Sequence, residues 1–115
     1  MKIVVLGLAV ALVLAVAQDQ PQKVGGNVAQ ANRISAVAPV YPPEAKQNGI
    51  QGIVRLEVII GKDGHVAELR ALGGPAELIM SAVDAVKQWV YRPTLLNGEP
   101  VAVQTTVDVN YTLSQ

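Results

Sequence analysis

The feature that most constrains the fold is a long alternation near the C-terminal end, over residues 101–113. Apolar residues, Thr and Tyr occupy every second position, and mostly polar residues lie between them. Successive side chains of a β-strand point to opposite faces of the sheet, so this pattern predicts one long strand with one buried face. The predicted buried face carries Val101, Val103, Thr105, Val107, Val109, Tyr111 and Leu113, and the other face carries Ala102, Gln104, Thr106, Asp108, Asn110 and Thr112. Such a strand needs partner strands and a layer that covers its apolar face.

Length and composition indicate one small domain. The chain has 115 residues, which is a usual single-domain size. It contains no Phe, so Val, Leu, Ile and Ala must supply most of the buried area, at about 25 cal/mol per Å². Lys and Arg together number 9 and balance 9 Asp and Glu, whereas a nucleic-acid-binding domain usually shows a basic face. We therefore expect no nucleic-acid partner. The sequence has no cysteine, which excludes disulfides and thiolate metal sites.

The first residues have the pattern of an export signal. Met1 and Lys2 form a short cationic start, residues 3–16 are apolar or small, and Ala17 completes an A-x-A motif before Gln18. The apolar run spans about 15 residues, whereas a helix needs roughly 20 to cross the hydrocarbon core of a membrane. We therefore expect a signal peptide over residues 1–17, cleaved between Ala17 and Gln18. The alternative is a short membrane anchor.

The segment after this signal has a different composition. Residues 18–38 are rich in Gln, Asn, Gly and Ala and show no period of 2 or 3.6 residues. This composition is typical of a flexible linker, with a root-mean-square reach of about 25 Å. The folded domain is then expected over residues 39–115.

The first half of this domain is predicted to contain a short helix and a β-hairpin. Pro42 and Pro43 favour a helical first turn, and the helix over residues 44–48 is expected to end at Gly49. Residues 52–60 alternate and predict a strand, with Val54, Leu56, Val58 and Ile60 on its apolar face. Residues 61–64, Gly-Lys-Asp-Gly, favour a turn into a second strand over residues 65–72.

The second half is predicted to contain the main helix and the long strand. Pro75 marks the helix start, and apolar residues at helical spacing continue to Trp89 and Val90. Pro93 disfavours helix at the residue before it, so the helix is expected to end near Tyr91. The predicted fold is α+β, a three-stranded antiparallel sheet with a main helix and a short leading helix on one face, in the order ββαβ.

The residues give no sign of catalysis or of a bound cofactor. His65 is the single histidine and follows the predicted turn, so a solvated turn is the simplest interpretation. Ser35, Ser81 and Ser114 are not part of a nucleophile motif, and there is no Gly-rich phosphate loop. Glu57 and Glu68 are a candidate carboxylate pair, but ion pairs with Arg55 or Arg70 on the sheet surface are the preferred interpretation. We therefore expect no enzyme activity, no metal and no cofactor.

The order of the turn and strand motifs resembles one known family. The motifs are Tyr41-Pro42-Pro43-Glu44-Ala45, then Gly52 before a strand, then Asp63-Gly64, then Trp89-Val90-Tyr91-Arg92-Pro93, and then Asn97-Gly98-Glu99-Pro100-Val101. In this order and spacing, residues 37–113 are similar to the C-terminal periplasmic domain of TonB energy-transducing proteins.

The resemblance implies a function in binding. Members of this family hold a short segment of an outer-membrane receptor, called its box, beside the last strand by β-strand addition, in energy-dependent transmembrane transport. Carried onto this chain, the augmenting strand is Val103, Gln104, Thr105, Thr106, Val107, Asp108, Val109, Asn110 and Tyr111, and the clamp is Ala38, Pro39, Val40, Tyr41 and Pro42. The best-characterised members carry Gln at the position of Ala38.

The resemblance also bears on localisation and partners. It implies a periplasmic or secreted protein after signal cleavage, or alternatively one anchored in the inner membrane and facing the periplasm. Members that contact the inner-membrane motor typically carry Ser and His in the apolar anchor, and neither occurs in residues 3–17, so these residues do not indicate motor coupling. The long Pro-rich spacer of larger members is also missing between the apolar segment and the domain.

Two alternatives remain open from the sequence. The chain is either a TonB-like receptor-binding protein or a secreted envelope interaction module that reuses the fold without motor coupling. The last strand has no Lys and no internal Pro to protect its edge, which favours a peptide partner or a homodimer formed through that strand. Trp89 and Tyr91 are expected in the core rather than at a binding surface.

Overall fold

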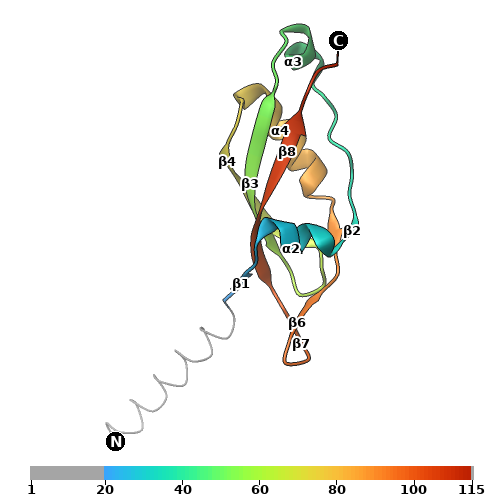
Figure 1. The fold of residues 1–115 in the computed structure, drawn as a ribbon, viewed down its shortest axis with the longest axis vertical. Helices are drawn as coiled ribbons and strands as arrows, with labels where there is room; N and C mark the ends of the chain where they lie inside the picture. The colour runs from blue at the N-terminus through green and yellow to red at the C-terminus, as the bar shows by residue number, and fades with distance from the viewer. Residues whose placement is uncertain (1–19, 115) are drawn as a thin grey trace, which may run out of the picture.

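The computed structural model describes residues 20–114 and contains one main sheet with the longest helix packed on one face (Figure 1). The four strands of this sheet lie in the order β1-β8-β3-β4, and two small two-stranded sheets accompany it. The elements are β1 (Gln22–Lys23), α2 (Gly26–Ala31), β2 (Arg33–Ser35), α3 (Pro43–Gln47), β3 (Gly52–Ile60), β4 (Val66–Gly73), α4 (Ala76–Val86), β5 (Val90–Tyr91), β6 (Thr94–Leu96), β7 (Glu99–Val101) and β8 (Val103–Tyr111).

The centre of the fold is the antiparallel pair β3 and β8. Their register runs without a shift from Gly52 opposite Tyr111 to Ile60 opposite Val103. The inward side chains of β3 are fully buried or nearly so, as its alternation predicts, and β4 pairs with its other edge. The α+β class is therefore confirmed. The sheet contains the antiparallel strands β8, β3 and β4, and β1 adds a short parallel strand, so it has four strands rather than the predicted three.

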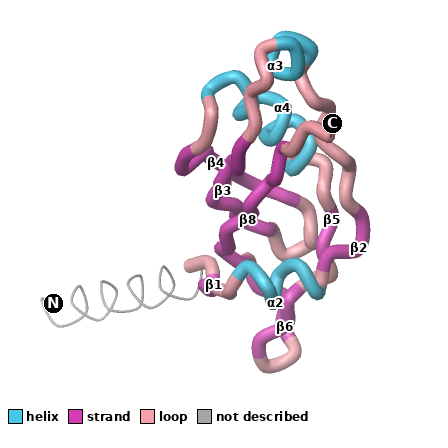
Figure 2. Tube along the Cα trace, turned by 45° about the horizontal axis from the view of Figure 1, so that its top comes forward, coloured by secondary structure: helices cyan, strands magenta, loops and turns pink. Residues whose placement is uncertain are grey.

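The core lies between this sheet and α4 (Figure 2). Leu78, Ala82 and Val86 of α4 are fully buried against the inward side chains of the sheet. Trp89 and Tyr91 are 7% and 2% exposed, so their predicted place in the core is confirmed. The short helix α3 ends as predicted, because Gly49 adopts φ 66°, which glycine favours.

The opposite face of the sheet carries two ion pairs. Arg55 Nε lies 2.8 Å from Asp108 Oδ1, and Arg70 Nε lies 3.0 Å from Glu57 Oε1. Glu57 stands opposite Arg70 and Glu68 stands opposite Ile59, so the two glutamates are not a direct cross-strand pair. The predicted ion pair is confirmed for Glu57. It is wrong for Glu68, because Arg55 pairs with Asp108 and no ion pair within residues 20–114 includes Glu68.

The predicted end of the main helix is wrong. α4 ends at Val86 rather than near Tyr91, because Val90 and Tyr91 form β5 and pair with β2. The amide of Tyr91 donates to the carbonyl of Gly64 at 2.8 Å, and Val90 bridges to His65. These contacts to the β3–β4 hairpin come from far away in the sequence, so the apolar spacing around Trp89 could not reveal them.

The segment predicted as a flexible linker is also ordered in part. Residues 22–35 form β1, α2 and β2, and Ala29 is 5% exposed within the core cluster. The amide of Gln22 donates to the carbonyl of Ala102, just before β8, and the amide of Val24 donates to the carbonyl of Gln104 in β8. The amide of Arg92 donates to the carbonyl of Asn32 at 2.8 Å. The elements are short and are held by these tertiary contacts, so the local pattern of residues does not indicate them.

The turn before the last strand is more elaborate than predicted. Asn97 and Gly98 adopt φ 53° and 83°, which is the turn chemistry expected of an Asn-Gly pair. This turn joins β6 and β7 in a separate small hairpin. Ala102 is not in a strand and separates β7 from β8, which begins at Val103. The long predicted strand over residues 101–113 is therefore divided.

No helix within residues 20–114 is both long enough and apolar enough to cross a membrane. The predicted signal peptide and its cleavage site at Ala17 and Gln18 lie outside the described residues.

Candidate functional site

The outer edge of β8 is the strongest candidate site. On one side β8 pairs with β3 along its whole length, and on the other side β1 pairs with it only at Val103 and Gln104. Within the described part of the chain, no strand pairs with this outer edge beyond Gln104. An unpaired edge of this kind exposes main-chain donors and acceptors that an added strand can use.

The hydrogen bonds of β1 define which residues face outward. The amide of Gln22 donates to the carbonyl of Ala102 at 2.9 Å, and the amide of Val24 donates to the carbonyl of Gln104 at 2.9 Å. The N–H and C=O of one strand residue point to the same side, and the side alternates along the strand. The backbone groups of Thr106, Asp108 and Asn110 therefore also point outward, whereas those of the odd-numbered residues point to β3.

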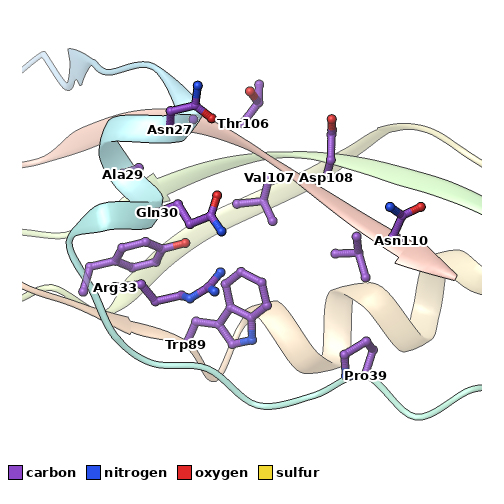
Figure 3. Close-up of a pocket in the computed structure, with 13 residues that line it drawn as sticks. Asn27, Ala29, Gln30, Arg33, Pro39, Trp89, Thr106, Val107, Asp108 and Asn110 are labelled. Carbon is purple, nitrogen blue, oxygen red and sulfur yellow. The ribbon is translucent and has the colours of Figure 1, made fainter.

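A groove lies beside this edge (Figure 3). Its volume is about 410 Å³, and it is bounded by β8, α2 and the segment that contains Pro39. Arg33, Trp89 and Val107 point into the space between α2 and β8, whereas Thr106 and Asp108 point away from it. The residues that line the groove are Gly26, Asn27, Ala29, Gln30, Arg33, Pro39, Trp89, Tyr91, Thr106, Val107, Asp108, Val109 and Asn110.

Arg33 and Trp89 form the floor of the groove. The guanidinium carbon of Arg33 lies 4.3 Å from the centre of the Trp89 ring, which is cation–π geometry. Among residues 20–114, no acidic side chain forms an ion pair with Arg33. Burial raises the pKa of Tyr91 from its usual value, and the charge of nearby Arg33 opposes that rise. The groove therefore has an apolar floor with one positive charge.

The predicted clamp segment is fastened to the domain by its backbone. Trp89 Nε1 donates to the carbonyl of Val37 at 2.8 Å, and the hydroxyl of Ser81 donates to the carbonyl of Val40. Tyr41 packs edge-to-face on Tyr111 with ring centroids 5.4 Å apart. The hydroxyl of Tyr41 donates to the carbonyl of Ile50, so Tyr41 anchors this segment rather than reaching toward the groove.

The structure brings together only some of the residues predicted for binding. Pro39 lines the groove with residues 106–110 of β8. Ala38 and Val40 line a different hollow against α4, with Ser81 and Asp84. Val103, Thr105, Val109 and Tyr111 are buried, and of these four only Val109 also lines the groove. Pro42 is the N-cap residue of α3.

Sequence reasoning missed the contribution of Arg33 and of α2 to the groove. Both lie in the segment predicted to be a linker, and no local period marks them. Gly26 fits its place because a Cβ there would lie 3.0 Å from the carbonyl oxygen of Thr106, but this close approach is visible only in the folded chain.

Within residues 20–114, no group of three or more His, Asp or Glu is placed to hold a metal ion. Asp63 Oδ1 accepts the amide of His65 at 3.1 Å, and this hydrogen bond holds the pKa of Asp63 below its usual value. Both side chains are mostly exposed, in keeping with a solvated turn.

Comparison with known proteins finds relatives of this chain. The sequence model of a family described as Gram-negative bacterial TonB protein C-terminal matches residues 37–113. Protein TonB of Vibrio cholerae is 34% identical over 79 residues, which cover 67% of this chain and 32% of that protein. Protein TonB of Xanthomonas campestris is 32% identical over 78 residues, which cover 66% of this chain and 35% of that protein.

A solved structure shows the same fold. The solution NMR structure of the Pseudomonas aeruginosa TonB CTD aligns with a TM-score of 0.62 and 25% identity, over 72% of this chain and 86% of that one. The match between sequences spans about a third of the length of the curated relatives. β1, α2 and β2 precede the residues that the family model matches. The chain belongs to the family of TonB C-terminal domains.

Proposed function

We propose that this domain binds an extended peptide from an outer-membrane receptor by strand addition to the outer edge of β8. The observation that carries the proposal is the pair of outward backbone positions, Asp108 and Asn110, which line an open groove and have no strand partner among the described residues. Main-chain hydrogen bonds supply most of the affinity in this binding mode, and side-chain pockets supply the specificity. Family membership supports the same role in energy-dependent transport across the outer membrane.

In this proposal the predicted site residues have different tasks. The even-numbered residues of β8 present donors and acceptors to the peptide, and their odd-numbered neighbours hold β8 on β3. Pro39 and Trp89 form the far wall and floor of the groove. The clamp of residues 38–42 then acts through its fixed backbone, which Ser81, Trp89 and Tyr111 hold in place.

We also propose that the protein is exported and that the mature chain begins at Gln18, as the A-x-A motif before it suggests. Intact-mass measurement of the protein from the cell envelope tests this proposal. A membrane-embedded product that retains Lys2 would instead support the anchored form.

The decisive test of strand addition is a proline at an outward position. Asp108→Pro removes an outward N–H and adds bulk where the incoming strand must lie, while the hydrogen bonds of β8 to β3 persist. We expect it to fold and to lose peptide binding. The measurement is fluorescence anisotropy with labelled synthetic peptides that cover the N-terminal segments of outer-membrane receptors from the same organism.

Two control variants complete the design. Asp108→Ala also loses the ion pair with Arg55 but keeps the outward N–H, so it should bind almost as well as the parent. Val107→Pro removes an inward donor and should disrupt the β3–β8 pairing itself. Undiminished binding by a folded Asp108→Pro variant would rule out strand addition at this edge. Concentration-dependent dimerisation that Asp108→Pro abolishes would show that a second copy of the chain occupies it instead.

A further inference from the structure

We propose that residues 22–32, which comprise β1 and α2, form an internal latch that occupies part of the peptide-binding edge and must detach before a peptide can pair along the whole of β8. This inference rests on the proposed function, because it concerns access to the same edge. It concerns a segment outside the residues that the family model matches.

The first observation is that the latch uses the hydrogen bonds that a peptide would need. The amide of Val24 donates to the carbonyl of Gln104 at 2.9 Å, and the amide of Gln22 donates to the carbonyl of Ala102 at the same distance. Lys23 stands in parallel register with Gln104. The latch therefore already occupies the start of β8 as an added strand.

The second observation is that α2 covers the next outward position. An added Cβ at Gly26 would lie 3.0 Å from the carbonyl oxygen of Thr106, so the helix backbone lies directly against that oxygen. Ala29 is 5% exposed and belongs to the core cluster. Of the outward positions from Gln104 to Asn110, the latch covers the first two and leaves Asp108 and Asn110 open.

The third observation is that the latch and the segment that follows it are held by different contacts. α2 has six residues, which is too short for independent stability, and Val28 on its outer side is 57% exposed. After Asn32, whose carbonyl accepts the amide of Arg92, β2 pairs with β5. Local opening of the latch would therefore end at Asn32 and leave Arg33 on Trp89.

A latch of this kind lowers the apparent affinity for a peptide. A ligand that needs the open form binds with its intrinsic affinity multiplied by the fraction of molecules that are open. If about nine in ten molecules are closed, opening the latch permanently tightens binding about tenfold. Peptide binding and latch closure then compete for the same edge.

Two neighbouring glycines offer a matched test. Gly26→Val places side-chain atoms against the carbonyl of Thr106 and should drive α2 off β8. Gly25→Val is the control, because nothing lies within 4 Å of a Cβ there and its extended backbone suits any residue. In the same anisotropy titration with receptor peptides, Gly26→Val should bind about tenfold more tightly than the parent, and Gly25→Val should match the parent.

A disulfide lock gives a second test that does not depend on the fold of the valine variant. The chain has no cysteine, so Lys23→Cys with Gln104→Cys creates a single possible pair across the β1–β8 register. Oxidation should hold the latch closed and weaken peptide binding at least about tenfold, and reduction of the same variant should restore it.

The outcomes separate the two proposals. If the parent binds receptor peptides, and neither Gly26→Val nor oxidation of the lock changes the affinity, the latch is overturned and strand addition at the open positions stands. If no variant binds any receptor peptide, latch open or closed, the proposed function fails and the latch has no role in it.

Discussion

Trp89 joins three parts of the site through one side chain. Its ring packs in the core, its face supports Arg33, and its indole N–H holds the carbonyl of Val37 at the start of the clamp segment. A residue with these contacts links the stability of the domain to the shape of the groove. Its substitution should therefore affect both.

Trp89→Ala should destabilise the domain by about 3–5 kcal/mol, because it leaves a large cavity in the core. This loss is a large part of the total stability of a small domain. Urea unfolding measures it, with Trp89→Phe as the control that keeps an aromatic ring but leaves the Val37 carbonyl unpaired. A loss below about 1 kcal/mol for Trp89→Ala would contradict the core position of the indole.

Tyr111 should make the free energy of unfolding depend on pH in the alkaline range. Burial raises its pKa above its ordinary value of 10.0, whereas its hydrogen bond to Ser81 lowers it. A tyrosine whose folded pKa is raised adds stability that is complete below the unfolded pKa and is lost as pH rises through the folded pKa. Stability should therefore fall above about pH 10, by up to about 1.4 kcal/mol per pH unit for this proton.

Tyr111→Phe isolates this effect, because it removes the titrating hydroxyl and keeps the ring beside Tyr41. Urea unfolding between pH 8 and 11 should show a shallower decline for the variant than for the parent, with Tyr91 accounting for the remainder. Parallel declines of the two proteins would exclude a raised pKa at Tyr111.

The bounds of a helix or strand were predictable where the residue pattern within that segment determines them. β3 has the predicted bounds because its four inward side chains follow the pleat and Gly52 and Gly61 flank it. The end of α4 and the segment of residues 22–35 were not predictable, because contacts to β8, Gly64 and Arg92 decide them. Pairing between segments that are distant in sequence leaves no period in either segment alone.

The candidate site was predictable to the same extent. The pattern of residues and the resemblance together indicated the edge of β8, and Pro39 of the predicted clamp does line the groove. The wall formed by α2 and the charge of Arg33 came from a segment without any regular pattern. Side chains that reach a site from such a segment become visible only after the chain has folded.

The β3–β4 hairpin is joined to β5 at a glycine whose position leaves no room for a side chain unless the backbone of β5 moves. Gly64 adopts φ 88°, and a Cβ there would lie 1.9 Å from the carbonyl oxygen of Tyr91. Gly49 also has a positive φ of 66°, but nothing lies within 4 Å of its Cβ position. An alanine at Gly49 would therefore meet backbone strain alone, whereas an alanine at Gly64 would meet both strain and steric overlap.

Gly49→Ala should cost about 1 kcal/mol from strain alone. Gly64→Ala should cost at least about 2 kcal/mol more, because the carbonyl of Tyr91 must move away and the bridge between His65 and Val90 is lost. Urea unfolding of both variants provides the measurement. Equal losses would show that β5 yields easily and does not hold the hairpin in place.

The whole molecule has a formal net charge of zero, but positive and negative side chains are distributed unevenly around the groove. Asp108 is paired with Arg55, and the hydrogen bond from that guanidinium lowers the pKa of the Asp108 carboxyl. Arg33 has no ion-pair partner among residues 20–114. The groove beside the open edge should therefore favour a peptide with an acidic side chain over one with a basic side chain.

Peptides that differ only by Glu, Gln or Lys at the position facing the groove should bind in that order of affinity. A charge-assisted contact of about 1 kcal/mol at a partly exposed site corresponds to roughly fivefold between Glu and Gln at low salt, and added salt should reduce it. Arg33→Ala should remove the preference while the Gln peptide still binds through the backbone of Asp108 and Asn110.

Arg92→Ala is the matched control, because Arg92 is exposed just after β5 and does not line the groove. If the Glu and Lys peptides keep their order of affinity in Arg33→Ala, the charge of Arg33 does not select the peptide, and the groove must select by shape.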